Sequence, residues 1–168
     1  MSRKAKEPQQ PSAAWLTPEQ QRAWLAYMRV QLRMTYEINR QLQSDHDLSV
    51  GDYDVLVALS NAEGGRLQLT TLAATIGWER SRVSHHLKRM AARGLVERCP
   101  SAVDRRATDA QLTDTGRTKL EAAAPGHVEV VRDLFFEGID EQLLPALTQA
   151  LEQAYARILD KGTLPSVD

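Results

Sequence analysis

The sequence predicts a mainly α-helical protein with a small β wing (an α+β fold): a winged helix-turn-helix flanked by N- and C-terminal dimerisation helices. Three observations predict it. Segments follow in the order helix, helix, short strand, helix, turn, helix, strand, loop, strand. Both ends carry amphipathic helices with more apolar surface than a chain of 168 residues can cover alone. Residues 78–118 hold nine basic and five acidic side chains, whereas residues 119–168 hold four and nine.

The first helix is expected from Thr17 to about Leu42, within an N-terminal dimerisation segment of residues 15–48. Thr17 can cap it, Pro18 suits its first turn, and Gln20 can complete a capping box. Apolar residues recur at three- and four-residue spacing and predict a stripe that is buried along much of the helix. They are Trp24, Leu25, Met28, Leu32, Ile38 and Leu42. Residues 1–14 and 162–168 are polar or proline-rich and are expected to be disordered tails.

Residues 49–114 are expected to form the winged helix-turn-helix lobe. A helix over about 51–61 precedes a short strand at 66–69, and Thr70 then caps a short helix that ends before a turn at Gly77. A helix over 80–93 follows. Gly94 ends that helix, and strands at 95–99 and 108–113 enclose the wing loop.

Residues 115–161 are expected to form two further dimerisation helices. Thr113 or Asp114 can cap the first of them, and Asp140 can cap the last. Pro125 and Gly126 fall inside the first helix, and they should kink or break it because proline lacks a backbone donor.

The helix over 80–93 has one apolar face and one basic, hydroxyl-rich face without an acidic residue. Val83, Leu87 and Met90 are its expected buried stripe. Side chains of the other face can bind DNA in a major groove, because arginine and lysine donate to guanine and hydroxyls bond to phosphates or base edges. The candidates are Arg80, Ser81, Arg82, Ser84, His85, Lys88 and Arg89.

The segment from Leu72 to Arg117 resembles the core of the MarR family of bacterial transcription regulators. The resemblance rests on Gly-Leu-Val at 94–96, Asp-Arg-Arg at 104–106 and Leu-Thr-x-x-Gly at 112–116. It implies a homodimer with intertwined terminal helices, two DNA-reading lobes and often a small-molecule pocket where lobe meets dimer domain. Thr70, at its helix cap, is a further candidate for a phosphate contact.

The wing loop contains two adjacent arginines. A guanidinium suits the narrow, electronegative minor groove of A·T-rich DNA. By resemblance, Arg106 enters that groove, and Arg105 binds the backbone or also reaches down. Asp104 is expected to pair with an arginine and brace the loop.

A ligand pocket is expected from aromatic and apolar residues near the junction of the lobe and the dimer helices. The candidates are Trp15, Trp24, Tyr27, Met28 and Tyr53. The resemblance implies small aromatic carboxylates or phenols as ligands, and an apolar slot with one cation suits such molecules. The alternative, that these side chains only build the dimer core, stays open.

The resulting hypothesis is a homodimeric, sequence-specific repressor that binds a pseudo-palindromic double-stranded DNA operator and is released by a small aromatic or phenolic ligand. No catalytic residue, metal site or cofactor is expected, because the sequence lacks a phosphate-binding glycine loop, a nucleophile and base pair, or metal-ligand spacing. Without an apolar segment long enough for a signal or membrane helix, the protein is expected in the cytoplasm. Two alternatives remain: control by thiol oxidation at Cys99, and a winged-helix dimerisation module without DNA.

Overall fold

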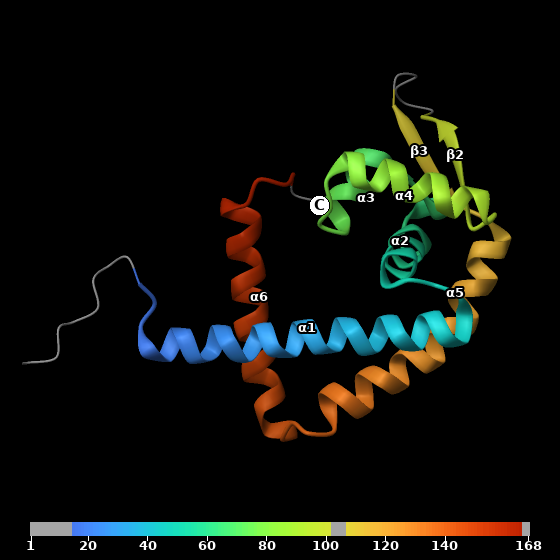
Figure 1. Cartoon of the computed structure of the whole chain (residues 1–168). Coiled ribbons are helices and arrows are strands. Elements are labelled where there is room, and N and C mark those ends of the chain that lie inside the picture. Colours follow the sequence, from blue (N-terminus) through green and yellow to red (C-terminus); the bar gives the residue numbers. More distant parts are fainter. Residues whose placement is uncertain (1–14, 102–106, 166–168) are drawn as a thin grey trace, which may run out of the picture.

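A long helix crosses beneath a small lobe in the computed structural model, which describes residues 15–101 and 107–165 (Figure 1). The helices are α1 (Pro18–His46), α2 (Val50–Ser60), α3 (Leu69–Thr75), α4 (Arg80–Ala92), α5 (Asp114–Val131) and α6 (Leu144–Lys161). The strands are β1 (Arg66–Gln68), β2 (Val96–Pro100) and β3 (Thr108–Leu112). A 3-10 turn (Glu63–Gly65) precedes β1, a π-helical turn (Arg132–Phe136) extends α5, and a second 3-10 turn (Glu141–Leu143) precedes α6. This is the predicted winged-helix architecture.

Helix α1 begins with the predicted capping box. The Thr17 hydroxyl accepts from the Gln20 amide at 3.2 Å, and the Gln20 side chain accepts from the Thr17 amide at 3.0 Å. The helix ends at His46, beyond the predicted Leu42, and Asp47 follows it in the left-handed conformation with φ 52°. The Lys119 ammonium of α5 donates to the His46 carbonyl at 2.7 Å and so holds the end of α1.

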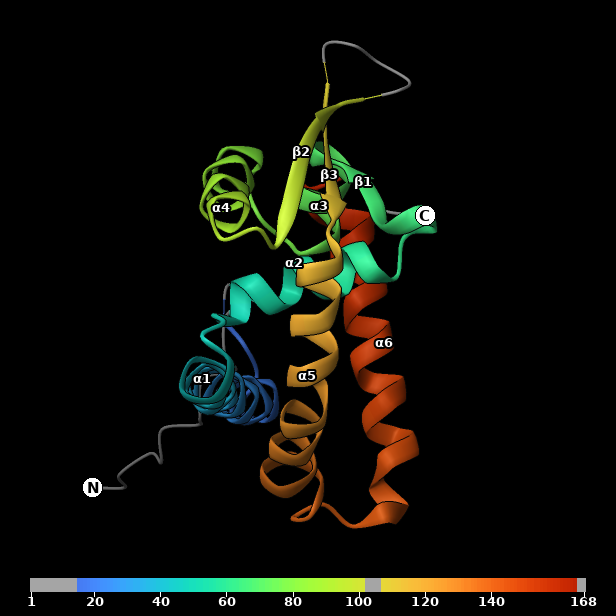
Figure 2. The same ribbon diagram turned by 90° about the vertical axis from the view of Figure 1, so that its right-hand side faces the viewer.

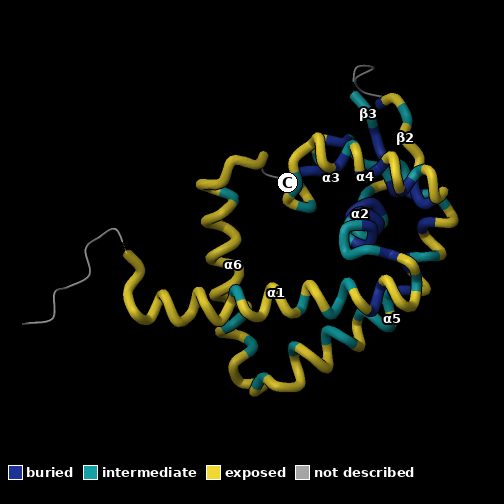
Figure 3. Tube along the Cα trace, in the orientation of Figure 1, coloured by how far each residue is buried: buried dark blue, intermediate teal, exposed yellow. Residues whose placement is uncertain are grey.

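The single chain leaves most of the apolar stripe of α1 uncovered, and its cover by a second copy stays a prediction. Only Gln41 and Leu42 are buried in α1, and Leu32 is 62 % exposed. Figure 3 shows the same contrast, because the buried positions are concentrated in the lobe and in the adjoining parts of α1 and α5. No other part of the described chain therefore covers most of the apolar stripe of α1.

The hydrophobic core belongs mainly to the lobe. Helix α2 contributes buried side chains on most sides and α4 contributes one stripe, while β2 and β3 close the core from the wing side. The largest fully buried side chains are Leu42, Leu48, Val55, Leu56, Leu59, Leu72, Val83, Leu87, Met90, Leu95 and Val96. The core thus fixes α4 by its inner face and leaves its outer face to solvent.

The sheet is antiparallel in the order β1-β3-β2. Val96 of β2 faces Leu112 of β3, and Pro100 faces Thr108 at the far end. Strand β1 pairs with the other edge of β3, and its Arg66 Nε lies 2.9 Å from the buried Asp109 Oδ2. The same guanidinium donates to the Pro100 carbonyl at 2.9 Å, so it ties all three strands together at the base of the wing.

The Leu-Thr-x-x-Gly sequence joins α5 to the end of α4. Thr113 caps α5 by accepting from the Gly116 amide at 2.9 Å, and its hydroxyl lies 2.7 Å from the Gly94 carbonyl. A Cβ on Gly116 would stand 2.1 Å from the Leu95 carbonyl oxygen, so only glycine fits this contact. Both motif residues therefore fix α5 against the segment between α4 and β2.

Helix α5 continues through Pro125 without the break that was one predicted outcome. Its ribbon changes direction midway, in agreement with the other predicted outcome, a kink (Figure 1). Gly126 lies against α1, where an added Cβ would stand 2.7 Å from the side-chain amide nitrogen of Gln41.

Helix α6 stands apart from the lobe core. Asp140 caps the 3-10 turn before it, by accepting from the Gln142 amide at 3.0 Å. None of the described residues of α6 is buried, and Leu151, Tyr155 and Ile158 are 46 %, 57 % and 64 % exposed. Figure 2 shows α6 separated from α1, which is seen end-on. An apolar stripe on an isolated helix is typical of a surface that another chain covers.

Candidate nucleic-acid interface and effector pocket

The outer face of α4 is exposed and positively charged. Ser84 is half-buried and the other predicted contact residues are exposed, while Val83, Leu87 and Met90 are buried as predicted. The exposed ones are Arg80, Ser81, Arg82, His85, Lys88 and Arg89. No acidic residue occurs within α4, and Glu79 lies just before it at the N-cap. The face thus has the charge and shape for a major groove, and its DNA contacts stay a prediction.

A buried carboxylate supports α4 from below. Asp52 of α2 receives the Arg93 guanidinium at 2.8 Å, lies 2.9 Å from His86 Nε2, and accepts from the Ser49 amide at 2.9 Å. Burial acts to raise the pKa of Asp52, but the bonds from His86, Ser49 and Arg93 outweigh it and hold that pKa well below the usual 3.8. The charged Asp52 therefore holds the middle of α4 and its C-terminal end to the start of α2.

Sequence reasoning missed this support. The sequence pattern assigned no role to His86, whereas the structure buries His86 between Asp52 and Arg89. Its position was the available signal, because His86 falls between Val83 and Met90 on the apolar stripe. The partner Asp52 is more than 30 positions away in the sequence, so no local pattern identifies it.

The wing is described up to its tip. The Ser101 amide donates to the Ala107 carbonyl at 3.0 Å and closes the hairpin ladder. Asp104, Arg105 and Arg106 lie outside the described residues, so the brace and the groove contact stay predictions. Within the described part, the brace is the pair Arg66 and Asp109, which sequence reasoning did not identify.

Thr70 does not cap α3, which corrects the prediction. The helix begins at Leu69, and the N-cap position is taken by Gln68, two residues before the predicted cap. Leu69 is buried in the core, and this anchors the helix start directly after β1. Thr70 is exposed in the first turn and donates to the Gln68 side chain at 2.6 Å. Its predicted phosphate contact remains untested.

The predicted ligand residues do not meet in one place in the single chain. Trp15 precedes α1, while Trp24, Tyr27 and Met28 lie in its N-terminal half. Trp24 and Tyr27 contact each other with ring centroids 5.6 Å apart. Tyr53 lies instead in α2 and packs on His127 of α5 at 4.6 Å. Of the predicted set, Tyr53 alone is placed at the junction of the lobe and α5.

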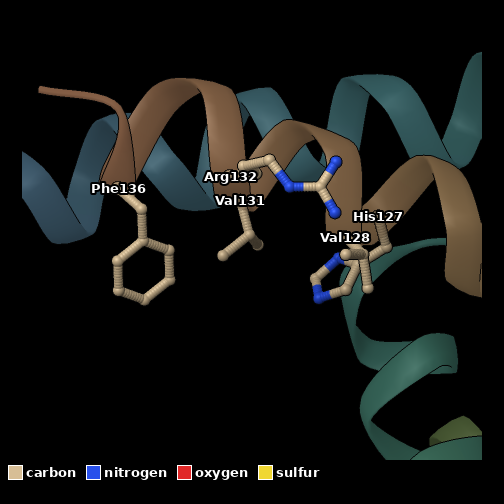
Figure 4. Close-up of a pocket in the computed structure, with 5 residues that line it drawn as sticks. All are labelled: His127, Val128, Val131, Arg132 and Phe136. Atoms are coloured by element: carbon tan, nitrogen blue, oxygen red, sulfur yellow. The ribbon is translucent and has the colours of Figure 1, made fainter.

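An open hollow of about 340 Å³ lies beside that junction on one face of α5 and its π-helical extension, and it is lined by His127, Val128, Val131, Arg132 and Phe136. In Figure 4 the two valines and the phenylalanine project from one side of the helix, and the Arg132 guanidinium extends along it toward His127. Burial lowers the pKa of His127, so its ring is neutral at pH 7. Its buried Nδ1 has no hydrogen-bond partner in residues 15–101 and 107–165. An apolar slot with one cation and one vacant polar atom suits a small anionic aromatic molecule.

Cys99 lies in β2 and is half-buried, with its Sγ 4.0 Å from the Asp109 carbonyl oxygen. Thiol control stays a prediction. Among the described residues, no group of three or more His, Cys, Asp or Glu side chains could hold a metal ion. In the same part of the chain, each helix is too short or too polar to span a membrane.

Comparison of the sequence with known proteins identifies a family and its relatives. Residues 46–107 match the sequence profile described as MarR family. The chain is 31 % identical over 135 residues to the HTH-type transcriptional repressor IacR of Pseudomonas putida, an alignment that covers 79 % of this chain and 75 % of the relative.

Two solved structures from Streptomyces coelicolor are also similar. AbsC, a MarR family transcriptional regulator, is 34 % identical with a TM-score of 0.79, over 86 % of this chain and 97 % of that one. Sco3205, a MarR family transcriptional regulator in complex with DNA, is 32 % identical with a TM-score of 0.83, over 92 % of this chain and 100 % of that one. These relatives are transcriptional regulators and not enzymes.

Proposed function

Because the chain belongs to the MarR family of transcriptional regulators, we propose that it is a homodimeric repressor that binds a pseudo-palindromic operator and is released by a small-molecule effector. The observation that carries this proposal is the exposed, acid-free face of α4 next to the β2–β3 hairpin. Such a helix enters a major groove, while the arginines of the wing loop suit the adjacent minor groove.

The apolar faces of the terminal helices support the homodimer. The chain leaves Trp24, Leu32, Leu151 and Ile158 largely exposed on α1 and α6. A two-fold pair of chains would cover these faces with copies of themselves. It would also present two α4 helices to half-sites about one helical turn, ~34 Å, apart.

The contact between α5 and the end of α4 offers a route by which a ligand releases the protein from its operator. The candidate pocket lies on α5 and its π-helical extension, and the start of α5 is bonded to the Gly94 carbonyl through Thr113. A ligand that moved α5 would therefore move the segment that ends α4. Affinity for the operator changes to the extent that the ligand binds one spacing of the two α4 helices better than the other.

We expect Arg106→Ala to weaken operator binding about tenfold and to reduce its salt dependence by about one unit of slope for each arginine lost. The reason is that a groove-bound guanidinium displaces counterions. Fluorescence anisotropy with the upstream region of the protein's own gene, at several salt concentrations, measures both quantities.

Arg40→Ala is the matched control, since it removes the same charge from an exposed position of α1. It should leave the slope nearly unchanged. If Arg106→Ala bound like the parent at every salt concentration, the wing assignment would be wrong. If the parent did not bind this upstream DNA more tightly than an unrelated duplex, the upstream region would not contain the operator.

Benzoate at about ten times its dissociation constant should raise the melting temperature by roughly 3–6 °C and lower operator affinity. The Arg132 guanidinium supplies the charge that its carboxylate needs, and Val128, Val131 and Phe136 supply the apolar surface. Arg132→Gln should abolish both effects, measured by thermal shift and anisotropy.

Arg157→Gln, an exposed position of α6, is the control and should respond like the parent. Benzamide, which lacks the charge, should shift the parent much less. An Arg132→Gln variant that still responded fully to benzoate would place the effector elsewhere.

A further inference from the structure

Two aromatic rings lie beneath the DNA-reading face of α4 and touch two of its arginines. The Trp78 and His86 rings meet edge to face with centroids 5.1 Å apart. The Arg82 Cζ lies 3.8 Å from the centre of the Trp78 ring, and an Arg89 terminal nitrogen lies 2.9 Å from His86 Nδ1. His86 is buried, whereas Arg82 and Arg89 are exposed. We name Trp78 and His86 the aromatic layer.

The contacts of His86 determine where its proton lies. A guanidinium only donates, so Nδ1 must accept from Arg89 and therefore carries a lone pair. The ring hydrogen then lies on Nε2, which is 2.9 Å from the Asp52 carboxylate but outside regular hydrogen-bond geometry. Asp52 is itself charged and bonded to Arg93. The close contact with Asp52 on one side of the ring thus leaves Nδ1 on the other side as the acceptor for Arg89.

Trp78 is held just as closely from the opposite side. A Cβ on Gly51 of α2 would stand 2.6 Å from Trp78 Cη2 and 3.4 Å from His86 Cε1. Only glycine at this position leaves room for the indole to lie under Arg82. The face of the indole attracts the guanidinium, which stacks on it with its donors in a fixed plane.

From this geometry we infer that the aromatic layer orients the Arg82 and Arg89 guanidinium groups for DNA, so that Trp78 and His86 are positioning residues of the operator-binding surface. The inference rests on the proposed function, in which both arginines contact DNA. Each bond to the layer uses only part of a guanidinium, which has five N–H donors, so the remaining donors can reach a phosphate or a base. An arginine held before binding loses less rotamer freedom on the DNA.

Three substitutions of His86 separate positioning from packing. His86→Asn keeps an acceptor near the place of Nδ1, His86→Gln keeps an amide near the place of Nε2, and His86→Leu removes both. We expect Asn to bind operator within about twofold of the parent, and Gln and Leu to bind about three- to tenfold more weakly. Melting temperatures identify any variant that fails to fold.

A double-mutant cycle with Arg89→Ala tests whether the effect passes through Arg89. The loss caused by His86→Gln should largely vanish when Arg89 is already alanine. Trp78→Leu should weaken binding about two- to fivefold with Arg82 present, and much less in an Arg82→Ala background. Equal losses in both backgrounds would overturn the inference and leave the aromatic layer as packing alone.

Nitrogen NMR of the His86 ring gives a readout that needs no DNA. We expect the Nε2–H tautomer in the parent, and a shift of the Nδ1 signal in Arg89→Ala as the hydrogen bond is lost. A proton on Nδ1 would overturn the inference even if operator binding were normal. If the NMR result held but Arg82→Ala and Arg89→Ala both bound operator like the parent, the DNA contacts of the proposed function would be wrong instead.

Discussion

Leu151→Glu is expected to convert the protein into a monomer that binds its operator at least about a hundredfold more weakly than the parent. Leu151 lies in the middle of the apolar stripe of α6, where the chain itself leaves it 46 % exposed. In a two-fold dimer each substitution occurs twice, and a buried, unpaired carboxylate costs several kcal/mol. A monomer also loses the second half-site, which in a dimer binds as an intramolecular step.

Sedimentation velocity and operator anisotropy measure the two effects on one sample. Gln153→Glu adds the same charge two residues away, on another face of α6, and should remain dimeric. If Leu151→Glu sedimented as a dimer with parental affinity, the stripe on α6 would not be the dimer interface.

Asp52→Asn is expected to lower the free energy of unfolding by about 2–3 kcal/mol at pH 7. The carboxylate is buried and holds Arg93 at 2.8 Å and His86 at 2.9 Å, so an amide leaves these partners without a matching charge. Asp47→Asn is the matched control. Asp47 is exposed and 3.5 Å from Arg93, and asparagine tolerates its positive φ, so the change should be below about 0.5 kcal/mol.

The effect of Asp52→Asn should depend on pH in one direction. Because folding lowers the pKa of Asp52 below its usual 3.8, its contribution is complete above that value and is lost as the pH falls toward the folded pKa. Urea unfolding should therefore show a large difference between parent and variant at pH 7 that shrinks below about pH 4. A difference that stayed constant down to pH 3 would mean that the Asp52 charge is not the cause.

Local patterns predicted the start of α1 and the elements of the lobe well. The capping box at Thr17, the apolar stripe of α4 and the two wing strands all involve residues within a few positions of one another, so spacing alone identifies them. The same patterns do not identify the surface that covers a stripe. A second copy was expected to cover the stripe of α1, and in the single chain Leu32 and Trp24 are exposed.

These local patterns could not identify contacts between residues that are distant in the sequence. The pairs Asp52 with His86 and Arg66 with Asp109 join residues 34 and 43 positions apart, and each forms only when two elements pack. The pocket on α5 is a similar case. Most of the predicted ligand residues belong to the N-terminal half of α1, and of the predicted set only Tyr53 of α2 lies near the pocket.

The sequence by itself determined the order of helices and strands, the basic face of α4 and the motif at 112–116, since each depends on residue type and local spacing. Tertiary structure alone decided which side chains support that face. The apolar stripe of α4 indicates that His86 faces inward, but only the packing of α2, which brings Asp52 and Gly51 beneath it, makes it a buried acceptor for Arg89. A hydrogen bond or a close contact depends on distances of a few ångströms between distant segments, and those distances exist only after the core has packed.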